Sequence, residues 1–146
     1  MTHCIKTEVE IAASPERVWA VLIDYARYAE WNPYIVRIDG EPRTAKTLVV
    51  HIVFSPGAPP SAGSVDVLAV EPPRLMQWEG GLPDRTQWRG DHHWVVEPRG
   101  TGALVRHFEH FSGTLADAIL AEHGDTIRAN FVRFNDALKM RAEEFG

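Results

Sequence analysis

The sequence has a single cysteine, Cys4, and it lacks long apolar runs. One thiol excludes an internal disulfide, and a chain of 146 residues does not need one, because a domain of this length buries roughly two-thirds of its unfolded surface. No apolar stretch approaches the roughly 18 residues of a membrane span, and the first residues do not resemble a signal peptide. We therefore expect one cytoplasmic domain over residues 1–146 with an ordinary apolar core.

An excess of positive charge is also missing. The chain has 15 lysines and arginines against 20 aspartates and glutamates, which gives a net charge of -5. Proteins that bind nucleic acid usually carry a basic face that neutralises phosphates. Here the basic residues are scattered among acids, so we expect neither nucleic acid nor an anionic membrane surface as a partner.

Several signatures of reaction chemistry are absent. The sequence contains no glycine-rich phosphate loop and no Gly-x-Ser-x-Gly elbow. No neighbour of Cys4 in the sequence would lower its pKa, which makes it a poor nucleophile. The histidine and acid spacings match no zinc motif. We expect no cofactor and no metal site, and we place His3, His51 and His123 on the surface.

What the sequence does contain begins with a strand and two short helices. Apolar and polar residues alternate from Ile5 to Ala12, which is typical of a half-buried strand. Ser14 is a good helix N-cap, and Pro15 suits the first helical position. A second short helix is predicted over 25–30, ending ahead of Pro33, because a residue before proline disfavours the helical conformation.

The middle of the chain has the pattern of a β-meander. Short connections between successive strands favour antiparallel pairing. The loops 55–63 and 81–90 are candidate lids over a binding site, or plain surface connections. The predicted strands are 34–39, 47–54, 64–71, 74–80, 92–97 and 103–111.

The C-terminal segment changes to a helical period. Apolar residues recur at steps of three and four, which indicates one face of a long helix; they are Ile127, Phe131, Phe134, Leu138, Ala142 and Phe145. Asp125 is a reasonable cap for it, so a shorter helix over 115–122 is expected, with a kink or break at Gly124. The resulting order is β-α-α-β6-α. We predict an α+β fold in which a curved seven-stranded antiparallel sheet wraps around this helix.

Several segments resemble the START-like, Bet v 1-like helix-grip superfamily, which includes polyketide cyclases/dehydrases and lipid-transfer domains. The segments are 11–24, 28–33, 73–80, 90–94, 107–113 and 131–139. This resemblance implies a deep cavity between the sheet and the long helix. It does not imply one function, because such a fold hosts carriers, sensors and enzymes.

Strand alternation places three ionisable groups on the inner face of neighbouring strands: His92, His107 and Glu109. A buried carboxylate is costly unless it is paired, so we expect Glu109 to contact one of the two histidines. Three interpretations stay open. The cluster is structural, or it anchors a ligand carbonyl or hydroxyl, or it serves as a general acid and base.

Aromatic and other large side chains supply the rest of the candidate site. Each of them either lines a cavity or packs in the core. Trp31 is placed at the rim and Trp88 near the mouth, whereas Met76 and Trp78 share a strand face. The candidate ligand-binding residues are Trp31, Phe54, Met76, Trp78, Trp88, His92, Trp94, His107, Glu109, Phe111, Phe131 and Phe134.

Three functions compete at this stage. The leading hypothesis is a binder, sensor or carrier of a small hydrophobic molecule, such as a lipid, an isoprenoid, an aromatic or a polyketide-like compound. The alternative is a cyclase/dehydratase-like or hydrolase-like enzyme in which Glu109 and His107 or His92 move a proton. The third is a partner-binding module, which would need an exposed apolar patch that the sequence does not indicate.

Overall fold

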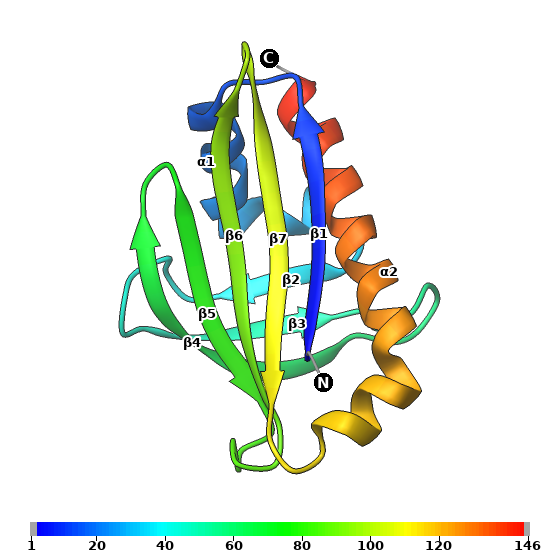
Figure 1. Cartoon of the computed structure of the whole chain (residues 1–146). Helices are drawn as coiled ribbons and strands as arrows, with labels where there is room; N and C mark the ends of the chain where they lie inside the picture. The colour runs from blue at the N-terminus through cyan, green and yellow to red at the C-terminus, as the bar shows by residue number, and fades with distance from the viewer. Residues whose placement is uncertain (1–2, 145–146) are drawn as a thin grey trace.

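In a computed structural model, which describes residues 3–144, a curved sheet wraps around the C-terminal helix (Figure 1). The predicted order of elements is confirmed. The strands are β1 (Cys4–Ile11), β2 (Ile35–Asp39), β3 (Thr47–Ile52), β4 (Ser61–Glu71), β5 (Leu75–Gly81), β6 (Arg89–Arg99) and β7 (Gly102–Ser112). The helices are α1 (Pro15–Ile23), the 3₁₀ helix η1 (Tyr25–Glu30) and α2 (Ala116–Glu143).

The sheet is a meander with its first strand moved to the far edge. Its seven strands follow the order β1-β7-β6-β5-β4-β3-β2, and every neighbouring pair is antiparallel. Strands β2 to β7 therefore pair with their sequence neighbours, and β1 pairs with β7. This arrangement puts the start of the chain beside α2 (Figure 1).

The two short helices close one end of the sheet, as the sequence predicts. The side chain of Ser14 accepts a hydrogen bond from the backbone N–H of Arg17, so the predicted N-cap of α1 is present. Trp19 of α1 is buried in the core. In η1, Tyr28 is buried, and its hydroxyl donates to the carbonyl oxygen of Leu22.

The long helix differs from its prediction in one respect. Helix α2 runs without interruption from Ala116 to Glu143, so the expected break at Gly124 and the cap at Asp125 are wrong. A single glycine inside a long helix lowers stability by roughly 1 kcal/mol, and packing against the sheet offsets this. The apolar stripe from Ile127 to Ala142 is buried as predicted, whereas Phe145 lies outside the described residues.

The two candidate lid loops are shorter than predicted. Strand β4 already begins at Ser61, because residues 61–63 pair with β3. Likewise, Gly81 still belongs to β5 and pairs with Arg89 of β6. Backbone pairing across the sheet overrides the weak strand propensity of glycine and serine at these positions. Among residues 3–144, no helix is both long enough and apolar enough to span a membrane.

Candidate functional site

A cavity of about 310 Å³ lies between the sheet and the first half of α2. Strands β2 to β7 contribute most of its wall, and α2 closes one side. Its lining is mainly apolar, with a few polar groups. The lining residues are Tyr34, Ile35, Val50, Ile52, Phe54, Gly63, Ser64, Val65, Trp78, Gly80, Gly81, Trp88, Gly90, His92, Glu109, Phe111, Ile119, His123 and Ile127.

Glycines on adjacent strands leave part of this space open. Gly80 of β5 and Gly90 of β6 are directly paired, and both line the cavity. A Cβ at Gly80 would lie 2.9 Å from Cγ1 of Val65, and a Cβ at Gly90 would overlap the carboxyl of Glu109. Larger side chains at these two positions would therefore collide with the wall.

Aromatic rings form much of the remaining wall. Trp88 stacks on Phe111 with ring centroids 4.8 Å apart. Phe54 meets the imidazole of His123 edge to face at 5.5 Å, which joins the β3–β4 connection to α2. Trp78 lies edge to face with His92 at 6.0 Å. These contacts hold large flat surfaces in place without filling the cavity.

The structure divides the predicted ligand-binding residues into two groups. Those that line the cavity are Phe54, Trp78, Trp88, His92, Glu109 and Phe111. Those packed in the core beside it are Met76, Trp94, His107, Phe131 and Phe134, each at most 1% exposed. Phe131 and Phe134 therefore fill the groove between helix and sheet. Alternation identifies the inner face of a strand, but it does not separate a lining residue from a packed one.

Trp31 is placed away from the cavity, contrary to the expectation of a rim position. Its indole packs against Tyr28 at 4.9 Å and Phe134 at 5.8 Å, and it borders a separate polar hollow beside α1. After Trp31, the side-chain oxygen of Asn32 accepts hydrogen bonds from the backbone N–H groups of Tyr34 and Ile35, where the chain enters β2. Tyr34, three residues later, is the side chain that reaches the cavity.

Sequence reasoning missed other lining residues. His123 is 43% exposed, as expected of a surface residue, but it also lines the cavity, because α2 is continuous through Gly124 and brings its first half over the sheet. Ile119 and Ile127 line it for the same reason, since they lie two turns apart on one helix. The helical spacing of Ile119, His123 and Ile127 was the available signal, and the predicted break concealed it.

The predicted polar cluster is present and buried. Nδ1 of His92 lies 3.5 Å from Oε1 of Glu109, and Nε2 of His92 lies 2.7 Å from Nε2 of His107. Glu109 therefore contacts His92, one of the two expected partners. The side chain of Glu109 is 15% exposed, whereas His107 is 0% exposed. Only the Glu109 end of the cluster, with His92, faces the cavity.

Two further residues extend this cluster into the core. Nδ1 of His107 lies 2.7 Å from Oδ1 of Asn135 on α2. Nδ2 of Asn135 donates to Oγ1 of Thr7 on β1 at 2.9 Å, and the Thr7 hydroxyl donates to the backbone oxygen of His107 at 2.8 Å. We call the chain Glu109–His92–His107–Asn135–Thr7 the relay. It joins β6, β7, α2 and β1.

Burial shifts the pKa of every ionisable group in the relay, in each case toward the uncharged form. Burial, assisted by the charge of Asp91, raises the pKa of Glu109 to about 8. Burial lowers the pKa of His107 to about 3, against the opposing effect of its bond to Asn135. Burial first, and the neighbouring His107 second, hold the pKa of His92 well below its usual value. At neutral pH the carboxyl and both imidazoles are therefore uncharged.

Tyr34 is the second polar group at the cavity wall. It is 7% exposed, and burial together with the charge of Glu109 raises its pKa above its ordinary range. Its hydroxyl therefore keeps its proton. Within residues 3–144 no hydrogen bond occupies this hydroxyl, so it can donate to a molecule in the cavity.

A curved antiparallel sheet wraps around a long helix, and a mainly apolar cavity lies between the two. This arrangement defines a helix-grip protein. The chain matches the polyketide cyclase/dehydrase and lipid transport family over residues 2–143. It therefore belongs to this family, as the sequence resemblance predicts. No curated protein matches it.

Solved structures share this fold at low sequence identity. Protein MLL2253 from Mesorhizobium loti is 20% identical, with a TM-score of 0.77 and 98% of each chain covered. Protein Ms6760 from Mycobacterium smegmatis is 16% identical, with a TM-score of 0.79 over 99% of this chain and 94% of that one. Ara h 8.0201 is 11% identical, with a TM-score of 0.66 over 94% and 98%. At these identities the likeness supports the fold alone.

The close approach of Gly90 to Glu109 gives a first prediction. Gly90→Ala should lower the free energy of unfolding by about 1–3 kcal/mol, because the new methyl group must displace the carboxyl. Gly63→Ala is the matched control, since a Cβ at Gly63 meets nothing within 4 Å. Urea unfolding measures both. Equal losses in the two variants would show that Gly90 is not needed to accommodate Glu109.

The raised pKa of Glu109 gives a second prediction, on stability against pH. Above the ordinary glutamate pKa the unfolded chain releases this proton, whereas the folded chain keeps it up to about pH 8. The contribution of Glu109 to stability is therefore fully present below about pH 4.5 and is lost as the pH rises to 8.

The difference in the free energy of unfolding between the wild type and Glu109→Gln isolates the contribution of Glu109, because His92 and His107 are present in both proteins. The variant should gain stability relative to the wild type as the pH rises from 5 to 8, measured by urea unfolding at each pH. A difference that stays constant across this range would mean that the folded and unfolded pKa values of Glu109 agree.

Proposed function

We propose that this chain, over residues 1–146, is a domain that binds a small, mainly apolar molecule in the cavity between the sheet and α2. The observation that carries the proposal is the cavity itself: about 310 Å³, an aromatic and aliphatic wall, and few polar groups. Small-molecule sites in proteins start at about this size and have this composition. Membership of a family described as polyketide cyclase/dehydrase and lipid transport supports it.

The wall favours a flat, rigid ligand of modest size. Trp88 and Phe111 present a stacked pair, and Trp78 and Phe54 add further ring surface. Such a wall suits one or two fused rings, or a short isoprenoid, better than a long acyl chain, which would exceed the volume. Within the expected set of lipid, isoprenoid, aromatic and polyketide-like molecules, we therefore favour the compact ring compounds. A cytoplasmic location stays a prediction from the sequence.

A side chain that fills the cavity should weaken ligand binding. Ile119→Trp places a large ring in the cavity from α2, and we expect it to weaken binding of the fluorescent probe 1-anilinonaphthalene-8-sulfonate about tenfold or more. Val132→Trp is the control, because Val132 is on the same helix, 43% exposed and outside the cavity lining. Equal affinity in both variants would place the probe elsewhere. Native mass spectrometry of the purified wild type, followed by denaturation, tests for a resident ligand.

A second candidate function is proton transfer to or from the bound molecule. The observation that favours it is Glu109, which faces the cavity, contacts His92 and has a pKa of about 8. A general acid or base works best when its pKa lies near the working pH. The pKa of His92 is held well below its usual value, so the imidazole stays neutral and Glu109 exchanges its proton directly with the bound molecule.

Hydrogen exchange on a ketone tests this chemistry without knowledge of the natural substrate. We expect the protein to accelerate deuterium uptake at the methyl group of 2-acetylnaphthalene in heavy water, and Glu109→Gln to lose about 100-fold or more of that rate. In the same variant we expect binding of the ketone to weaken only modestly. Exchange at the buffer rate in the wild type, with the ketone bound, would leave a binding function without proton transfer.

A further inference from the structure

The direction of every hydrogen bond in the relay follows from Thr7, the residue at the end farthest from the cavity. Oγ1 of Thr7 lies 2.8 Å from the backbone oxygen of His107. A carbonyl oxygen only accepts, so the hydroxyl proton of Thr7 is committed there. Asn135 must then donate to Thr7 through its amide nitrogen, which turns Oδ1 toward Nδ1 of His107. The hydrogen bonds of Thr7 therefore fix the orientation of the Asn135 amide.

The direction continues through the two imidazoles. Because Oδ1 of Asn135 accepts, Nδ1 of His107 carries a proton. A neutral imidazole has one proton, so Nε2 of His107 accepts and Nε2 of His92 donates across the 2.7 Å contact. Nδ1 of His92 is consequently unprotonated, and it is the nitrogen that lies next to Glu109.

A bare nitrogen opposite Glu109 favours the acid form of its carboxyl. A carboxylate there would place two lone pairs against each other in an apolar surrounding, which is unfavourable. At 3.5 Å the contact is longer than a good O–H···N hydrogen bond, so the proton of Glu109 remains available to an oxygen in the cavity. The hydroxyl of Tyr34 offers a second proton at the same wall.

We propose that Thr7 and Asn135 act as positioning residues that fix the direction of the relay, and that the cavity therefore selects ligands with an uncharged acceptor oxygen, such as a carbonyl, over ligands with an ammonium group. Neither residue lines the cavity. This inference rests on the proposed binding function and names the ligand chemistry for the same site.

Other titratable groups surround Glu109 and bear on its proton. On β6, His92 contacts Glu109 and Asp91 acts on it through its charge. Tyr34, just before β2, and His123 of α2 line the same cavity. The charge of Asp91 disfavours the ionised carboxyl, and His92 and Tyr34 are uncharged. Burial and Asp91 together raise the pKa of Glu109 to about 8, which agrees with the acid form that the relay requires.

The first test needs no ligand. We expect ¹⁵N chemical shifts to show His107 protonated at Nδ1 only and His92 protonated at Nε2 only, in the wild type and in Thr7→Ser. In Thr7→Val the amide of Asn135 is free to rotate, and we expect the shifts of both histidines to move toward a mixture of tautomers. A bare Nδ1 on His107, or a protonated Nδ1 on His92, in the wild type would overturn the proposed direction.

The second test uses three probes of one shape: 2-acetylnaphthalene, 2-isopropylnaphthalene and 1-(2-naphthyl)ethylamine, titrated by NMR at pH 6.5. In the wild type and in Thr7→Ser we expect the ketone to bind about tenfold or more tightly than the amine. In Thr7→Val that ratio should fall about tenfold. The affinity for the ketone should also decrease above pH 8, and Glu109→Gln should remove this decrease.

The outcomes separate the two proposals. If the hydrocarbon and the ketone bind but the amine binds equally well or better, the cavity binds apolar molecules and the inferred selectivity is wrong. If none of the three probes binds to the folded protein, the proposed binding function fails together with the ligand class. The histidine shifts then still decide the direction of the relay.

Discussion

The interaction on which the site depends is the pairing of three ionisable side chains inside an apolar interior. Glu109, His92 and His107 lose their water on folding, and each would be costly without a partner. Asn135 of α2 and Thr7 of β1 complete the hydrogen bonds of the two histidines, and His92 in turn contacts Glu109. The same contacts that stabilise the polar groups therefore hold the helix and the edge strand against β6 and β7.

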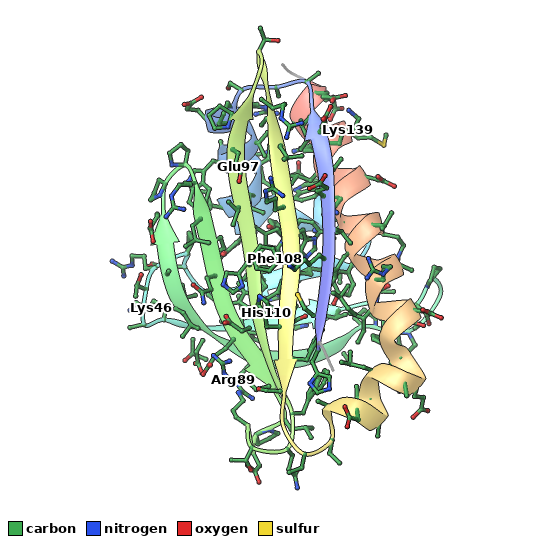
Figure 2. The ribbon with its side chains drawn as sticks, in the orientation of Figure 1. Lys46, Arg89, Glu97, Phe108, His110 and Lys139 are labelled. Atoms are coloured by element: carbon green, nitrogen blue, oxygen red, sulfur yellow. The ribbon has the colours of Figure 1, made fainter. Side chains whose placement is uncertain are left out.

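The cavity exists because the packing of α2 changes along its length. In its second half Phe131, Phe134 and Leu138 fill the groove completely. In its first half Ile119, His123 and Ile127 line the cavity together with the paired glycines of β5 and β6, and space remains. Outward-facing residues of β7, such as Phe108 and His110 labelled in Figure 2, lie on the opposite face of the sheet and take no part in the cavity.

Local patterns in the sequence were sufficient for the fold and for the face on which the polar cluster lies. Alternation put His92, His107 and Glu109 on the inner side, and the cap at Ser14 and the apolar stripe of α2 were also confirmed. The errors came where local signals conflict with packing. Gly124 does not interrupt α2, because burial of the stripe outweighs the glycine, and His123 was missed for that reason.

The sequence by itself determined the order of the elements, the inner face of each strand and the residue types available to the site, because these depend on short-range periodicity. Only the tertiary structure decided which aromatic lines the cavity and which fills the core. It alone brought Thr7 and Asn135, 128 residues apart, into one hydrogen-bonded chain with His107. No local pattern encodes such a contact, since it arises when the edge strand β1 pairs with β7 and α2 packs against both strands.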